Sequence, residues 1–168
     1  MVQDQVAAMQ QNVRAAIHFI ERDLMMAGFD PYRTGNASVT AATNNSITFT
    51  YYEDYNNQDD DGDTIIDEAD ELNLETIAYA LYDAFTSSSE NDGIADDLGR
   101  TEAGTIQPLA VNIQAIDFVY LDGDGNQLGD TDADNITDTM TAADRGNIRT
   151  IEVTLVGKTN DLAEGIWV

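Results

Sequence analysis

Large apolar residues near the start of the chain recur at every third or fourth position, a spacing that places them on one face of an α-helix. Polar residues fill the opposite face, and the pattern stops at Gly28, shortly before Pro31. A glycine followed by a proline is typical of a helix that has ended. The sequence therefore predicts an amphipathic helix over residues 1–28, about 40 Å long. Its apolar face comprises Val2, Val6, Met9, Val13, Ile17, Ile20 and Leu24.

The hydrophobic period changes beyond Pro31. Residues 46–52 alternate polar and apolar side chains and are rich in β-branched and aromatic residues, a pattern typical of a half-buried strand. Similar patterns predict further strands at residues 76–82, 113–121 and 148–156.

Polar stretches rich in Asp, Asn and Gly separate the predicted strands. Loops of this length are uncommon in a compact domain unless they have a function or are disordered. A chain of 168 residues suits one domain. One long helix followed by antiparallel strands predicts an α+β fold, with a helix at 1–28 and a sheet domain with Asp-rich loops at 29–168. The expected loops are residues 53–71, 87–105 and 122–147.

The chain is strongly acidic, with 32 Asp and Glu residues, 7 Lys and Arg residues and a net charge of -25. Nucleic acids and anionic lipids are bound mainly through Lys and Arg, so this charge argues against both partners. Two compatible interpretations are solubility in salty water and a set of cation sites. Because the chain has no cysteine, it has no thiolate nucleophile and no zinc site of the cysteine type.

Carboxylates alternate around a glycine in residues 59–70. Calcium takes roughly six to eight oxygen ligands, which a tight loop supplies from positions one, three, five, nine and twelve and from the carbonyl of position seven. Unpaired carboxylates this close would repel one another, so a bound cation is a better explanation than a solvated loop. With Asp59 as position one, the predicted Ca²⁺ ligands are Asp59, Asp61, Asp63, Asp67, Asp70 and the carbonyl of Ile65.

This register departs from the EF-hand pattern at two positions. Thr64 stands at position six, where glycine is usual, and Asp70 stands at position twelve, where a longer glutamate is usual. A register that begins at Asn57 restores Gly62 at position six and Glu68 at position twelve. The sequence does not choose between the two registers. Because no pair of clear amphipathic helices flanks either one, we expect a calcium loop outside an EF-hand fold.

Weaker candidates lie elsewhere in the chain. Residues 130–138 repeat the one-three-five-nine spacing without a twelfth ligand, whereas residues 122–126 and 91–96 are more typical of plain turns. His18 is expected on the polar face of the helix. No nucleophile stands beside a base in a recognisable motif, so we expect no enzymatic activity.

Residues 9–31 resemble the helix exit of PilW-type minor pilins of type IV pili and of the similar GspJ-type pseudopilins. The similarity rests on Gln-Asn-Val-Arg-Ala-Ala at 11–16, Arg-Asp-Leu at 22–24 and Ala-Gly-Phe-Asp-Pro at 27–31. Residues 118–125 and 148–156 are similar to paired strands near the C-terminus of that family. The resemblance covers about half of the chain.

The resemblance implies a pilin-like fold, with the long helix packed on an antiparallel sheet. It also implies a preceding hydrophobic half-helix, absent here, that holds the precursor in the bacterial inner membrane. The implied function is assembly or tip structure of type IV pili at the cell surface or in the periplasm. The implied partners are other minor and major pilins, bound through the helix and the sheet edges. The alternatives are a calcium-dependent adhesin with a surface ligand and a pseudopilin of a type II secretion system.

Overall fold

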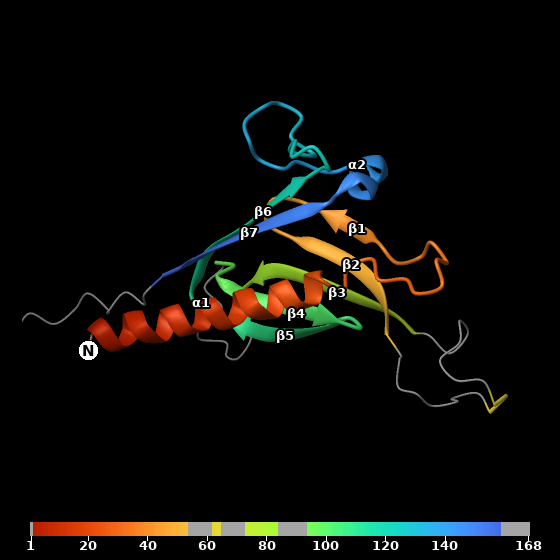
Figure 1. Cartoon of the computed structure of the whole chain (residues 1–168). Coiled ribbons are helices and arrows are strands. Elements are labelled where there is room, and N and C mark those ends of the chain that lie inside the picture. The colour runs from red at the N-terminus through yellow and green to blue at the C-terminus, as the bar shows by residue number, and fades with distance from the viewer. Residues whose placement is uncertain (1, 54–61, 65–72, 84–93, 159–168) are drawn as a thin grey trace, which may run out of the picture.

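The computed structural model describes residues 2–53, 62–64, 73–83 and 94–158. In this part of the chain an N-terminal helix accompanies two antiparallel sheets, which confirms the α+β class (Figure 1). The five-stranded sheet has the order β1 (Val39–Ala42), β2 (Ile47–Glu53), β3 (Asn73–Tyr82), β4 (Asp97–Glu102) and β5 (Thr105–Ala110). The remaining elements are α1 (Val2–Leu24), α2 (Ala142–Asn147), and the two-stranded sheet of β6 (Ile113–Leu121) and β7 (Thr150–Gly157).

Helix α1 has 23 residues and ends close to the predicted boundary. Turns follow it as far as Gly28, which has a φ of +75°. Glycine adopts this left-handed conformation at little cost, which explains why the helix stops there. The N–H of Gly28 donates to the carbonyl of Thr50 at 2.9 Å, so the end of the helix is joined to β2. Within the described residues, no helix combines the length and hydrophobicity needed to span a bilayer.

The buried face of α1 is rotated relative to the predicted apolar stripe. Ala16 and Ile20 are fully buried and Asp23 nearly so, whereas Ile17 and Leu24 are half-buried. The prediction was based on large apolar residues and therefore missed Ala16, whose small side chain permits close packing.

Gly157 marks the closest approach of β7 to the helix. A Cβ atom there would lie 2.9 Å from Cγ of Met9 and 3.0 Å from Cγ2 of Val13. These distances leave no room for a side chain, so glycine allows the strand to lie directly against α1.

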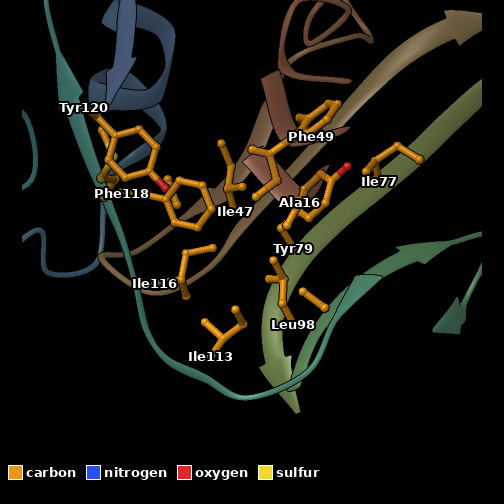
Figure 2. Close-up of a cluster of buried hydrophobic side chains, with 14 of the residues drawn as sticks. Ala16, Ile47, Phe49, Ile77, Tyr79, Leu98, Ile113, Ile116, Phe118 and Tyr120 are labelled. Carbon is orange, nitrogen blue, oxygen red and sulfur yellow. The ribbon is translucent and has the colours of Figure 1, made fainter. Parts of the chain in front are cut away.

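The helix and both sheets share the same hydrophobic core, which Figure 2 shows. Buried side chains come from the middle strands of the larger sheet, from β6 and from α1. The hydroxyl of buried Tyr120 donates to the carbonyl of Thr43 at 3.0 Å, which satisfies its polar end. The labelled core residues are Ala16, Ile47, Phe49, Ile77, Tyr79, Leu98, Ile113, Ile116, Phe118 and Tyr120.

A nearly buried ion cluster joins α1 to the larger sheet. The carboxylate of Asp23 accepts hydrogen bonds from the Tyr79 hydroxyl at 2.8 Å and from Nε of Arg100. The side chains of Asp23 and Arg100 are 9% and 12% exposed. Nη1 of Arg100 also pairs with Glu102 at 2.7 Å. Burial alone would raise the pKa of Asp23, but the hydrogen bonds from Arg100 and Tyr79 outweigh it and hold that pKa below its ordinary value.

The four predicted strands are found as β2, β3, β6 and β7. Two predicted loops are wrong in part, because 87–105 contains β4 and 122–147 contains α2. Strand β4 has little β-branched character, and its pairing with β3 and β5 determines its conformation. Helix α2 begins at a capping box formed by Thr141 and Asp144, a sequence signal that was not used in the prediction. Strands β1 and β5 were also missed, and the predicted loop at 53–71 lies mostly outside the described residues.

Candidate metal centre

The loop after β6 is closed at its base by main-chain contacts. The N–H of Asp138 donates to the carbonyl of Gly129 at 2.9 Å. Thr137 and Met140 anchor the far side, with exposed fractions of 2% and 3%. Gly129 has a φ of +78°, and a Cβ atom there would lie 2.6 Å from Cγ of Met140. Both the conformation and the contact require glycine, so the base of the loop has one well-defined geometry.

Inside the loop, backbone N–H groups point at carboxylates. Asp130 accepts hydrogen bonds from the N–H of Ala133 at 2.7 Å and from that of Asn135 at 3.0 Å. Ala133 and Asn135 both have a φ of +64°, so the backbone turns left-handed at alternate positions. The N–H of Ile136 donates to Asp134 at 2.8 Å. These Asx-type bonds curl the chain around its own acidic side chains.

The curl brings three carboxylates together. Ligand oxygens of Asp130, Asp132 and Asp134 all lie within 4.8 Å of one another. Asp130 is half-buried, and the other two are exposed. Within the described part of the chain, no Lys or Arg pairs with any of them. The three aspartates could therefore hold a metal ion, at the first, third and fifth positions of the spacing recognised in the sequence.

The electrostatics of the loop separate two kinds of aspartate. The negative charge of Asp134 raises the pKa of Asp132, with smaller contributions from desolvation and from Asp138. In contrast, the hydroxyl and N–H of Thr131 donate to Asp138 and lower its pKa. Asp138 was the candidate ligand at position nine, but it bonds to Thr131 and is not part of the three-carboxylate cluster. Repulsion is therefore concentrated on Asp132 and its neighbours, where a cation would relieve it.

The predicted calcium loop at 59–70 is only partly described. Asp63 lies in the described segment 62–64 and is exposed. Gly62 and Thr64 have φ values of +87° and +81°, so both adopt the left-handed conformation that favours glycine. Gly62 is position six of one register and Thr64 of the other, so both registers stay open and the loop remains a prediction. The predicted ligands outside the described residues are Asp59, Asp61, Ile65, Asp67 and Asp70.

The short acidic segment after β6 has the contacts of a plain turn. Asp122 accepts from the N–H of Asp124 at 2.9 Å and from the N–H of Asn126 at 2.8 Å. Its other oxygen accepts from the side-chain amide of Asn126 at 3.0 Å. Both carboxylate oxygens of Asp122 therefore accept hydrogen bonds from within its own turn. In the other expected turn, 91–96, residues 91–93 lie outside the described part of the chain.

Comparisons with protein-family models, curated proteins and solved structures found no match to this chain. The assignment of a function therefore rests on the residues, their contacts and the resemblance noted in the sequence.

Proposed function

We propose that this protein is a non-catalytic, PilW-like minor pilin that takes part in type IV pilus assembly or tip structure and binds calcium. The observation that carries the proposal lies in the segment similar to minor pilins, residues 9–31. Its Arg-Asp-Leu step contains Asp23, which joins the helix to β3 and β4 through Tyr79 and Arg100. Its Ala-Gly-Phe-Asp-Pro ending contains Gly28, which joins the helix to β2. Two of the residues that carry the resemblance, Asp23 and Gly28, thus attach the helix segment to the five-stranded sheet.

Calcium is the metal that we assign to the acidic loop at residues 130–138. Its ligand set is composed of carboxylate oxygens, which hard divalent cations prefer. Calcium accepts variable geometry and more ligands than magnesium does, so Asp130, Asp132 and Asp134 can be supplemented by water and backbone carbonyls. The exposed position of Asp132 and Asp134 suits such a partly hydrated ion.

In this proposal calcium completes the folded subunit where assembly takes place. An ion bound only by the native state adds RT ln(1 + [L]/Kd) to the free energy of unfolding, about 2.7 kcal/mol at a hundredfold excess over Kd. The proposed location is a cell-surface pilus or the periplasm, with the full-length precursor anchored in the bacterial inner membrane. The proposed partners are other minor and major pilins.

The calcium part is tested by isothermal titration of the metal-free protein with Ca²⁺. The key variant carries Asp132→Asn and Asp134→Asn, and the matched control carries Asp124→Asn in the neighbouring turn. We expect one binding event to disappear in the double variant and to persist in the control. If the double variant binds as many ions as the wild type, the three-carboxylate cluster is not a calcium site.

The pilin part is tested by deleting the gene in its own host and counting surface pili. We expect few or no pili after deletion, and recovery when the full-length gene is returned. Normal piliation with a loss of protein secretion would assign the chain to a secretion system. Normal piliation with a calcium-dependent loss of adhesion would make it an adhesin.

A further inference from the structure

The strand edges of the two sheets are protected to different degrees. Strand β1 has four residues and a bulge, and Nε of Arg145 donates to the carbonyl of Val39 at 3.2 Å. Strand β5 carries Pro108, which has no N–H to offer another strand. The outer side of β6 is occupied where the N–H of Phe118 donates to the carbonyl of Asn44 at 2.6 Å. Within the described residues, β7 is the edge that lacks such protection.

The hydrogen-bonding groups on the outer side of β7 follow from its register. The main-chain groups of Phe118 and Tyr120 bond on the side away from β7. In an antiparallel ladder, the residues opposite such positions also point outward. Val153 lies opposite Phe118 and Ile151 lies opposite Tyr120, and Leu155 continues the alternation. The N–H and C=O groups of these three β7 residues therefore face outward, and no hydrogen bond occupies them in the described part of the chain.

A groove of about 790 Å³ borders β7, and its lining comes from β7, the C-terminal half of α1, α2 and the start of β1. Its apolar lining includes Ile17 and Leu24 from the helix and Ile151 and Val153 from the strand. In Figure 1, α1 lies below β7. A chain segment lying along the edge would find main-chain partners in β7 and apolar side chains in the adjoining groove.

Two arginines and Glu21 line this groove, so its lining has a net positive charge whereas the whole protein is strongly negative. Arg145 and Arg149 both line it. Their side chains donate to backbone carbonyls, among them Met140 at 2.8 Å and Ile148 at 2.7 Å. Within the described residues neither forms a salt bridge, although the chain has 32 acidic residues. The groove therefore suits a partner that carries carboxylates.

We propose that the outer edge of β7 binds an extended segment of another polypeptide as an additional β-strand. The segment would place apolar side chains on α1 at alternate positions and a carboxylate on Arg145 and Arg149. A second copy of this chain fits less well, because it would bring its own α1 and its own charge of -25 to the same groove. The inference goes beyond the proposed function, because it requires neither the calcium loop nor the pilin assignment.

The test uses a synthetic peptide of eight residues, the length of β7. The peptide alternates valine and threonine and carries two aspartates at one end. Nuclear magnetic resonance of the whole chain should show slower hydrogen exchange at the amides of Ile151, Val153 and Leu155 after the peptide is added. Two further peptides are N-methylated at one or the other set of alternate residues. Strand addition predicts that one set weakens binding at least about tenfold and that the other has little effect.

Protein variants address the charge and the edge separately. Arg149→Glu should weaken peptide binding about tenfold, and Arg33→Glu, outside the groove, should leave it unchanged. Val153→Pro removes an outward-facing N–H without removing a bond to β6, so it should abolish binding and retain the fold.

Three results would overturn the inference. The first is the absence of binding at millimolar peptide, and the second is equal binding by both N-methylated peptides. The third is self-association of the wild type that Val153→Pro abolishes in analytical ultracentrifugation, which would assign the edge to a second copy.

Discussion

Two groups of carboxylates in this protein have opposite surroundings. Asp23 is nearly buried at the end of α1, and hydrogen bonds from Arg100 and Tyr79 hold its pKa below the ordinary value despite burial. Asp132 is exposed at the tip of a loop, and the charge of Asp134 raises its pKa. The buried aspartate is thus the easier of the two to ionise. Proximity to a positive charge outweighs exposure to water in setting the charge state.

The difference indicates where an external cation could replace a missing internal one. With 7 basic and 32 acidic residues, the chain can provide an internal partner for only a minority of its carboxylates. Arg100 is shared by Asp23 and Glu102 at the joint between helix and sheet. The loop at Asp130 has no such partner among the described residues. A bound metal ion would neutralise its carboxylates, as Arg100 neutralises Asp23 in the core.

Removing the internal cation should cause the largest loss of stability. Arg100→Leu leaves the carboxylate of Asp23 nearly buried without its main partner, and breaking a buried pair costs about 3–5 kcal/mol. We expect a decrease of this size in the free energy of unfolding, measured by urea titration. The double variant Asp23→Leu, Arg100→Leu should recover part of the loss, because both charges are then absent. A loss below about 1 kcal/mol would mean that the cluster behaves as a surface pair.

Supplying the external cation should give a stabilisation of somewhat smaller size. At a calcium concentration about a hundredfold above Kd, the free energy of unfolding should rise by about 2.7 kcal/mol. Thermal unfolding with excess Ca²⁺ and with a chelator measures this effect. Comparing Asp132→Asn, Asp134→Asn with Asp61→Ala, Asp63→Ala shows which acidic loop is responsible. Equal melting temperatures with calcium and with chelator would refute a structural ion in either loop.

Lowering the pH should weaken the stabilising contribution of Asp23 and reduce the destabilising repulsion at Asp132. Because the pKa of Asp23 is lowered on folding, its contribution to stability is complete above its ordinary value of 3.8 and is lost as the pH falls through the lower folded-state pKa. Because the pKa of Asp132 is raised on folding, its repulsion is relieved as the pH falls. Urea titrations from about pH 5 to pH 2 should show that Asp23→Leu, Arg100→Leu flattens the acid loss. Unchanged acid sensitivity in that variant would contradict the role of Asp23.

The smallest predicted effect is that of Asp132→Asn on the melting temperature, and its sign should depend on whether calcium is bound. Asp132→Asn removes one of three neighbouring charges, so the metal-free protein should melt at a slightly higher temperature. With saturating calcium the same variant should melt below the wild type, because it lacks a ligand. Asp124→Asn is the matched control and should show no such reversal. If Asp132→Asn shifted the melting temperature in the same direction with and without calcium, the repulsion at Asp132 would be unrelated to metal binding.

The helix and four strands were predictable because their patterns are local. Gly28 ends the helix region as expected, and β6 has its predicted limits of 113–121. The ion cluster was not predictable in the same way. Asp23 interrupts the apolar face between Ile20 and Leu24, which is a signal, but Arg100 lies 77 residues further along the chain. A contact over this distance depends on the tertiary arrangement, which local periodicity does not encode.

The candidate metal centre was predictable in its spacing and not in its geometry. Alternate aspartates at 130, 132 and 134 are visible in the sequence. The curl that brings them together depends on left-handed backbone at Ala133 and Asn135, and alanine gives no sequence signal for that conformation. The same limit explains why Asp138 was expected at the site, whereas its carboxylate bonds to Thr131.

The attachments at the end of α1 define a path for mechanical load. Asp23 is bonded to Tyr79 in β3 and to Arg100 in β4, and Gly28 is bonded to Thr50 in β2. A pull along the helix axis would therefore be divided among three adjacent strands in the middle of the five-stranded sheet. Because these strands are hydrogen-bonded to one another, tension would have to displace them together. In the proposed filament, a subunit held by its helix would thus resist traction through its sheet as a whole.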